Sequence, residues 1–437
     1  MRGMACVNKI FRVLIILILV SLYCGIDVEP VSAVSVVVNT TNDDEDVEDS
    51  YCSLREAVSA IKNIDGDYYG CVGGDVSSSI TLPAGTYTVN SQLSINTTIT
   101  IDGADSKTTI IQASDCNPTQ DTCTNIHMIF WVYGSGDLTL NHLTVRYGKN
   151  IDDGNGGAIF NGGALNIVNS KFTENRGAYG GVIKNLSGTV TITDSTFSGN
   201  VADDRAGVID NDGTIFITNS TFIGNKSQDE SDFGNGGVIY NSNTGTVIIE
   251  KSTFSGNSGW FGGAISNFGI QEVTNSTFSG NYASIRGGAI YDNNSLTISN
   301  CTFSENTSEY GGAAIDISVN GTLNYSNTII ANGIIGELGF ECNSAGTIGT
   351  NSSNLVEDGS CGAVYSGDPS LDPLADNGGP TQTHALNEES IAIDHGNFAS
   401  CPLTDQRGVE RPQGGGCDIG AYERESTATV FLPLILR

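Results

Sequence analysis

The chain has 437 residues, of which 55 are glycine and 16% are charged, and its formal net charge is −30 at pH 7. That charge argues against nucleic acid or an anionic lipid surface as a partner, because both would repel the protein. It is compatible with a solvated surface protein and with the binding of cations.

Residues 1–33 have the features of an export signal. Basic residues at positions 2, 9 and 12 precede an apolar run over residues 13–23, and Val31-Ser32-Ala33 offers a cleavage site of small residues. The apolar run is too short for a membrane span. We therefore expect an exported chain with no transmembrane span once the signal is removed.

Nine cysteines remain without the signal, and most fall into local pairs. Because an exported chain permits disulfides, we expect four short closed loops. The pairs are Cys52–Cys71, Cys116–Cys123, Cys342–Cys361 and Cys401–Cys417. Cys301 is left over and takes the place of a serine in a repeated slot, so we expect a buried free thiol. No cysteine or histidine set has the spacing of a zinc site.

An acidic run over residues 43–49 comes next. Its carboxylates would suit calcium, but the spacing of an EF-hand loop is missing. A solvated charged turn is the simpler interpretation, and we expect no cofactor other than such a calcium ion.

A short helix is predicted from Leu54 onward. Ser53 and Glu56 form a capping box, and the apolar stripe follows helical spacing. That stripe consists of Leu54, Ala57, Val58 and Ile61. We expect residues 34–79 to be an N-terminal cap, because the first coil of a solenoid leaves its core and strand edges uncovered. The phrase Cys52-Ser53-Leu54-Arg55-Glu56-Ala57 resembles a motif near the start of many bacterial surface β-helix proteins.

Two short phrases then alternate with a period of about 25 residues. Phe-x-x-Asn occurs at Phe172/Asn175, Phe197/Asn200, Phe222/Asn225, Phe254/Asn257, Phe278/Asn281 and Phe303/Asn306. Gly-Gly-(Ala/Val)-Ile begins at Gly156, Gly180, Gly236, Gly262 and Gly287. A fixed period of this size indicates a solenoid, in which each unit buries its apolar face against its neighbours.

The finer pattern indicates the kind of solenoid. In Val190-x-Ile192-x-x-Ser195-x-Phe197, residues two apart lie on one face of a strand, so each phrase holds two short strands. Asn or Asp at the corner between them tolerates a left-handed backbone. With a third inward pair from Gly-Gly-Ala-Ile, we predict three strands per coil. The fold class is all-β, a right-handed parallel β-helix of about ten coils over residues 80–335, with the six phenylalanines stacked inside and the asparagines in a second ladder.

These repeats resemble those of chlamydial polymorphic outer-membrane proteins over residues 155–306. Those proteins are surface adhesins delivered as autotransporters with a membrane barrel. About 100 residues follow the last repeat here, too few for that barrel, so we do not expect the same delivery. The resemblance therefore implies a surface location and an adhesive function alone.

The last hundred residues change character. Asp405-Gln406-Arg407-Gly408, an Arg-Pro pair and Cys417-Asp418-Ile419-Gly420-Ala421-Tyr422-Glu423 follow one another. This order resembles the choice-of-anchor Q domain of secreted bacterial β-helix proteins, which precedes surface-sorting tails. We expect a C-terminal cap over residues 336–425. Residues 426–437 are expected to be a sorting or attachment tail, because their apolar run is short and broken by Pro433.

The acidic residues of one coil are the place where a catalytic site would be expected. Asp203, Asp204, Asp210 and Asp212 are the first candidates, since a glycosidase needs two carboxyls about 5–9.5 Å apart. The Asn-Thr-Asp and Gly-His-Gly phrases of polygalacturonases are missing. The slot of Asp210 holds Lys184, Tyr240 and Ser266 in other coils, which we interpret as exposed, variable corner positions. A polysaccharide lyase or hydrolase acting on acidic polysaccharide is the alternative function.

A binding surface is the preferred interpretation. The residue before each glycine pair should fall in a line on one flank, and aromatic and arginine side chains there suit a glycan or a protein ligand. The line comprises Asn155, Tyr179, Arg205, Asn235, Phe261, Arg286 and Tyr310, with Trp260 adjacent. In the alternative, these side chains only cover the glycines. We expect a secreted, cell-surface adhesin or structural envelope protein without catalysis.

Overall fold

The computed structural model describes residues 35–45, 49–62, 70–72, 78–120, 123, 126–228, 236–335 and 339–425. They belong to one compact unit, Ser35–Arg437. The predicted export signal and C-terminal tail lie outside the described residues.

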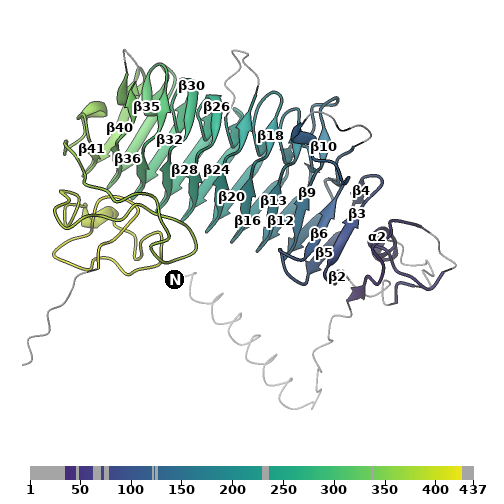
Figure 1. The fold of residues 1–437 in the computed structure, drawn as a ribbon. Helices are drawn as coiled ribbons and strands as arrows, with labels where there is room; N and C mark the ends of the chain where they lie inside the picture. Colours follow the sequence, from purple (N-terminus) through teal and green to yellow (C-terminus); the bar gives the residue numbers. More distant parts are fainter. Residues whose placement is uncertain are drawn as a thin grey trace, which may run out of the picture. The chain divides into compact units, whose positions relative to one another are not determined.

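The unit is an all-β parallel solenoid of about ten coils (Figure 1). Two of its four sheets, A and B, hold the two strands of phrases such as Val190-x-Ile192-x-x-Ser195-x-Phe197. Sheet A comprises β1 (Val36–Val37), β2 (Ser79–Leu82), β5 (Thr98–Gly103), β8 (Asp137–Asn141), β12 (Ala164–Val168), β16 (Thr189–Thr193), β20 (Thr214–Thr218), β24 (Thr246–Glu250), β28 (Ile270–Thr274), β32 (Ser295–Ser299), β36 (Thr322–Ser326) and β40 (Thr347–Ser352). Sheet B comprises β3 (Gly85–Thr88), β6 (Thr109–Gln112), β9 (Thr144–Arg146), β13 (Lys171–Thr173), β17 (Thr196–Ser198), β21 (Thr221–Ile223), β25 (Thr253–Ser255), β29 (Thr277–Ser279), β33 (Thr302–Ser304), β37 (Ile329–Ala331) and β41 (Leu355–Val356).

The other two sheets complete each coil, in the order A, B, D, C. Sheet C comprises β4 (Leu93–Ile95), β7 (Phe130–Val132), β11 (Ile159–Asn161), β15 (Ile183–Asn185), β19 (Ile209–Asn211), β23 (Ile239–Asn241), β27 (Ile265–Asn267), β31 (Ile290–Asp292), β35 (Gly312–Ile317) and β39 (Phe340–Ser344). Sheet D comprises β10 (Lys149–Asn150), β14 (Arg176–Gly177), β18 (Val201–Ala202), β22 (Lys226–Ser227), β26 (Ser258–Phe261), β30 (Tyr282–Arg286), β34 (Thr307–Ser308) and β38 (Ile334–Ile335).

Sheet D corrects the prediction of three strands per coil. Its strands follow directly after the asparagine of each Phe-x-x-Asn phrase, and several are only two residues long. Pairs such as Arg176-Gly177 and Lys226-Ser227 carry no alternation of apolar and polar residues, so the pattern on which a strand prediction rests is missing.

Six phenylalanine rings form one internal stack, the arrangement that the repeat predicted. From Phe172 to Phe303, neighbouring ring centroids are 4.7–5.0 Å apart and the ring planes differ by 5–10°. All six rings are fully buried. The stack follows from strand pairing, because parallel strands in register place identical side chains above one another.

Polar ladders satisfy the backbone beside this stack. From Asn175 to Asn306, each side-chain amide donates to the Oδ1 of the next asparagine at 2.9–3.1 Å. From Ser170 to Ser252, each backbone N–H donates to the hydroxyl of the next coil at 3.1–3.2 Å. From His142 to Ser353, the corner residues between sheets A and B have φ of 46–53°, which explains why most of them are asparagine or aspartate.

A second asparagine ladder, which sequence reasoning missed, ends the strands of sheet C. From Asn161 to Asn267, each side-chain amide donates to the Oδ1 of the next coil at 2.6–2.8 Å, and the last acceptor is Asp292. The signal was the Ile-x-Asn triplet that closes most glycine-pair phrases.

The glycine pairs mark a close approach between coils. A Cβ atom on Gly181 would overlap the carbonyl oxygen of Gly207, and one on Gly207 would overlap that of Gly237. Since no side chain fits between these backbones, the pair is restricted to glycine.

Helix α2 (Leu54–Lys62) covers the first coil, where it contacts β2 and β4. Its capping box is closed, because the Ser53 N–H donates to Glu56 Oε2 at 2.8 Å and the Glu56 N–H donates to Ser53 Oγ at 3.1 Å. Leu54, Ala57 and Val58 are buried against the core.

The residues after 335 first extend the solenoid and then fold back onto it. Strands β39, β40 and β41 continue three sheets beyond residue 335, where the sequence placed the end of the stack. The turns η2 (Ser360–Gly362) and η3 (Phe398–Ser400) lie in the irregular chain that follows; η1 (Pro118–Gln120) lies near the start. Residues 357–425, called here the C-terminal segment, fold back onto sheet B from β25 to β37 (Figure 1).

All four local cysteine pairs are disulfide-bonded, and Cys301 is a buried free thiol. Disulfides of this number are typical of proteins outside the reducing cytosol.

Candidate functional site

The carboxylate first suspected of catalysis is not exposed. Asp210 is the middle residue of β19 in sheet C, and its side chain is fully buried. Lys184 Nζ lies 2.8 Å from Asp210 Oδ1 and 2.6 Å from Asp212 Oδ2, and Arg205 lies 3.5 Å from Asp210 Oδ2. The interpretation of this slot as an exposed corner was wrong, because the slot lies in mid-strand beneath a second layer of side chains.

These four groups neutralise one another. Burial alone would lower the pKa of Lys184, but the carboxylates of Asp210 and Asp212 outweigh it and raise this pKa. Burial likewise acts to raise the pKa of Asp212, and the hydrogen bond from Lys184 reverses the effect, so the carboxyl pKa is lowered. Burial raises the pKa of Asp210 against the two cations. Each carboxylate is already held by a cation, which is a poor arrangement for proton transfer to a sugar.

The other two suspected aspartates lie elsewhere on the coil. Asp203 accepts from Arg176 Nε at 2.7 Å, and the backbone carbonyl of Asp204 accepts from the Ser227 hydroxyl. The structure therefore brings together Asp210 and Asp212, but not the predicted set of four.

The slot of Asp210 belongs to an outward column of sheet C. Strand pairing aligns the residue that follows each isoleucine of the glycine-pair phrase, and one earlier strand, β7, continues the column. The column consists of Trp131, Phe160, Lys184, Asp210, Tyr240, Ser266, Tyr291 and Asp316. Sequence reasoning saw the variation in this slot and named Tyr240 in it, but missed Trp131, Phe160 and Tyr291.

The residues before the glycine pairs lie over this column. The Arg205 guanidinium is 4.5 Å from the ring centroid of Tyr179 and 5.1 Å from that of Tyr240. The rings of Phe261 and Tyr291 are 5.0 Å apart. Part of the predicted line thus covers the outward column of sheet C, whereas the alternative interpretation had these side chains covering the glycines.

The remaining members of the predicted line, and Trp260 beside it, have different surroundings. Arg286 is exposed and lies 3.9 Å from Asp316, and Tyr310 is 58% exposed. Trp260 lies in β26 of sheet D, where its indole nitrogen is enclosed without an acceptor among the described residues. Asn155 is partly buried, and Asn235 lies outside the described residues.

Together the two layers form what we call the aromatic belt. Its ring contacts are Tyr133–Trp131 at 5.8 Å, Trp131–Phe160 at 4.6 Å, Tyr240–Phe268 at 5.5 Å, Phe268–Tyr291 at 6.1 Å and Tyr291–Phe261 at 5.0 Å. Tyr179 and Arg205 extend the second run beyond Tyr240, and Tyr310 follows at the far end. From β7 to β35 the belt crosses seven inter-strand spacings, about 34 Å.

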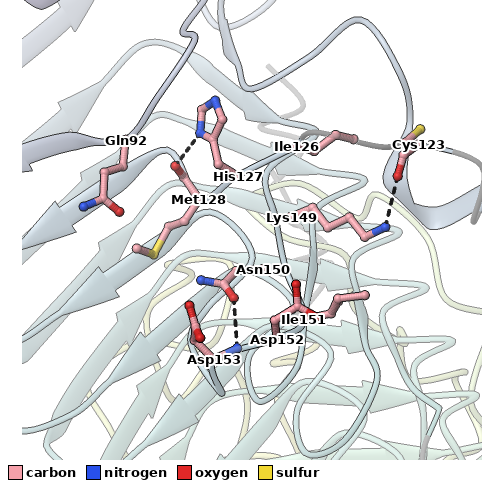
Figure 2. A pocket seen from close by; sticks show the side chains of 10 residues that line it. All are labelled: Gln92, Cys123, Ile126, His127, Met128, Lys149, Asn150, Ile151, Asp152 and Asp153. Atoms are coloured by element: carbon pink, nitrogen blue, oxygen red, sulfur yellow. Dashed lines mark hydrogen bonds between the residues drawn. The ribbon is translucent and has the colours of Figure 1, made fainter.

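A separate cavity of about 350 Å³ lies beside β10, and Figure 2 shows the side chains that line it. His127 directs Nδ1 toward the Met128 carbonyl at 2.8 Å and Nε2 toward the Val89 carbonyl at 3.1 Å. Lys149 Nζ donates to the Cys123 carbonyl at 3.3 Å. Since these nitrogens already face backbone oxygens, the cavity offers no nucleophile paired with a base.

The acidic run near the N-terminus is partly used by structure. Asp43 pairs with Arg55 at 2.9 Å and accepts from the Asn90 N–H at 2.6 Å. Across the described ranges, no three carboxylate, histidine or cysteine side chains gather closely enough to hold a metal ion. No helix in the described part of the chain has the length and apolarity needed to cross a membrane.

Comparison with known proteins agrees with this architecture. The family model described as the Chlamydia polymorphic membrane protein (Chlamydia_PMP) repeat matches residues 275–293 and 300–318. No curated protein matches the chain. The crystal structure of pectate lyase Pel9A is similar with a TM-score of 0.53 at 15% identity, over 90% of this chain and 98% of that chain.

A weaker likeness is to the A-module of the Azotobacter vinelandii mannuronan C-5 epimerase AlgE6. Its TM-score is 0.24 at 12% identity, over 69% of this chain and 96% of that chain, which is too low to carry an argument. The likeness to Pel9A concerns the fold alone. The chain is thus a parallel β-solenoid that contains repeats of the Chlamydia polymorphic membrane protein type.

Proposed function

We propose that this chain is a secreted cell-surface binding protein without catalytic activity, and that the aromatic belt is the face that holds its ligand. The observation that carries the proposal is the belt itself, in which partly exposed rings and arginines recur along sheet C between β7 and β35. Tyrosine, tryptophan and arginine are the side chains that dominate binding surfaces, because they bury a large area and keep a polar tip.

The location at a surface is supported by two further observations. The repeats match a family described as membrane proteins, and four disulfides suit an oxidising compartment. The absence of catalysis is supported by the ion pairs of Asp210 and Asp212, since both carboxylates are engaged by Lys184.

A triple alanine variant at Tyr179, Phe261 and Tyr310 tests the binding face. We expect it to lose adhesion to cells and signals on a glycan array, because it removes three rings from the belt. The matched control replaces Phe216, Ile270 and Val319, which are exposed and lie off the belt. Unfolding curves report whether each variant is folded. Undiminished adhesion of the folded belt variant would rule out the assignment.

A second assay tests the absence of catalysis. The purified mature chain is incubated with acidic polysaccharides, and new reducing or unsaturated ends are measured. Release of such ends would overturn this part of the proposal. In that event Asp210→Asn and Asp212→Asn become the first substitutions to make, with Asp203→Asn as the control from the same coil.

A further inference from the structure

We propose that the uncovered half of sheet B carries a second binding site, a basic groove for a linear anionic polysaccharide. The groove has a volume of about 460 Å³ and crosses strands β6, β9, β13 and β17. Three basic side chains line it, Lys107, Arg146 and Lys171. This site is on a different sheet from the aromatic belt and does not depend on it.

The floor of the groove is set by strand register. Thr144, Lys171 and Thr196 are paired in successive strands, as are Arg146 and Thr173. From β6 to β17 the floor covers three inter-strand spacings, about 15 Å. A groove that runs along the stack suits an extended chain of repeating units better than a compact small molecule.

The charges in the groove are unusual for this protein. The chain has 49 acidic and 19 basic residues, and its arginines find acidic partners more often than its lysines do. Every other arginine in the described part of the chain forms an ion pair. Arg146 is the exception, with no ion pair to a described residue. Lys107 and Lys171 lack one as well, as do the other described lysines apart from Lys184. Three unpaired cations in one groove leave room for an anionic ligand.

Arg146 is held in position by its neighbours. Its Nε donates to Gln112 Oε1 at 2.8 Å, and its guanidinium carbon lies 4.7 Å from the ring centroid of Tyr147. Gln112 is fully buried and donates to Thr88 Oγ1 at 3.0 Å, so the acceptor itself is fixed. The two terminal nitrogens of Arg146 stay available, and a positioned guanidinium pairs well with a carboxylate or sulfate group.

The rest of the lining favours a sugar chain over a nucleic acid. Ser106, Thr144, Thr173 and Thr196 supply hydroxyl and backbone polar groups, while no aromatic side chain is among the lining residues. Single-stranded nucleic acids bind to stacking platforms of aromatic rings, which this groove does not offer. Asp194 at one end is the single acidic side chain of the lining, and it would repel an anion but accept from a sugar hydroxyl.

The C-terminal segment leaves this half of sheet B open. It covers the outward residues from β25 onward, whereas Ile223 in β21 is still 43% exposed and Lys171 in β13 is exposed. A ligand therefore reaches the groove without displacing any described part of the chain.

The test measures binding of polygalacturonate oligomers to the mature chain by titration calorimetry at low and at physiological salt. We expect binding that weakens with salt, because exposed charges are screened. The double variant Arg146→Gln/Lys171→Gln should lose about tenfold in affinity or more, as charge-assisted hydrogen bonds disappear. Asp194→Asn should bind more tightly. The control Lys62→Gln/Lys226→Gln removes the same charge away from the groove and should bind like the parent chain.

Three competing probes decide the ligand class. A sulfated glycan that binds in place of the uronate, with the same loss in the double variant, supports the site and identifies sulfate as its anion. Equal binding of the methyl-esterified, neutral oligomer would overturn the proposal, as would tighter binding of single-stranded DNA. No binding of either anionic glycan at low salt would also overturn it. The belt variant Tyr179→Ala/Phe261→Ala/Tyr310→Ala should bind the uronate normally, which separates this site from the proposed adhesive face.

Discussion

The two halves of the outward face of sheet B share one strand sequence but have different surroundings. A Thr-Phe-Ser triplet forms β17 in the open half, and the same triplet forms β25, β29 and β33 in the covered half. Thr196 is partly exposed, whereas Thr253 and Thr277 are fully buried. A repeat can therefore bury its polar face without changing sequence, provided that another segment brings hydrogen-bond partners.

Gln406 of the C-terminal segment is the main partner. Its Oε1 accepts from the Thr277 hydroxyl at 2.7 Å, and its Nε2 lies 2.9 Å from the hydroxyls of both Thr253 and Thr381. Gly420 packs directly onto the strands, and a Cβ atom there would come within 2.8 Å of Ile329. The Asp-Gln-Arg-Gly and Ile-Gly-Ala phrases of this segment thus serve to dock it on sheet B.

The largest expected effect comes from truncating the phenylalanine rings that are buried beneath both halves of sheet B. Phe222→Ala in the open half and Phe254→Ala in the covered half should each cost about 3–5 kcal/mol of unfolding free energy, through lost burial and a cavity. Because the ring stack has the same spacing at both sites, the two costs should agree. Denaturant unfolding measures both. A much larger cost for Phe254→Ala would show that the cover stiffens the interior, contrary to this expectation.

The same substitution at equivalent threonines of the two halves tests whether the C-terminal segment stabilises the half that it covers. Thr277→Val should cost about 1–3 kcal/mol, because it leaves the buried Oε1 of Gln406 without a donor. Thr196→Val, the same change in the open half, should be nearly neutral. Equal effects in denaturant unfolding would mean that the hydrogen bonds to the C-terminal segment add nothing to stability.

The covered half should also respond to acid. Burial lowers the pKa of His384, whose Nδ1–H donates to the Asp372 carbonyl at 2.7 Å while Nε2 accepts from the Ser279 hydroxyl at 3.0 Å. The folded pKa is below the unfolded one, so stability is complete above about pH 6.5 and declines as the pH falls further.

Hydrogen exchange can locate this acid response. As the pH falls, amides of β29 should lose protection before those of β17. His384→Gln, which keeps a donor and an acceptor, should abolish the difference between the two strands. Simultaneous loss of protection in both strands of the parent chain would contradict the role given to His384.

The smallest expected effect is that of Cys301→Ser. The Cys301 thiol lies 3.3 Å from the Ser299 carbonyl, where serines of other coils donate to the equivalent carbonyl at 2.8 Å. The substitution should change the unfolding free energy by less than about 1 kcal/mol. Burial raises the pKa of this thiol to about 12, so alkylation should require unfolding. Rapid alkylation of the native chain would show that the slot is accessible.

The interior could be predicted because its signals are local. Alternation across Val190-x-Ile192 and the corner asparagines determine which side chains point inward, and strand pairing then stacks them. The strands of sheet D and the burial of Asp210 were missed, because neither two-residue strands nor an outward slot in mid-strand carries an alternating pattern. The cover on sheet B was missed for another reason: Thr253 and Thr277 meet partners 129 residues further along the chain.

The amide chain that closes sheet C has a direction, and this direction limits how the protein can change in length. Each asparagine from Asn161 to Asn267 donates forward to the next coil, and Asp292 at the end is a carboxyl whose pKa burial raises to about 6. Duplicating a coil between these asparagines would lengthen the stack by about 4.8 Å and leave every amide matched. Duplicating the coil of Asp292 would instead set two acceptors against each other. Coil duplication therefore preserves the amide hydrogen bonds in the middle of the molecule but not at the coil of Asp292.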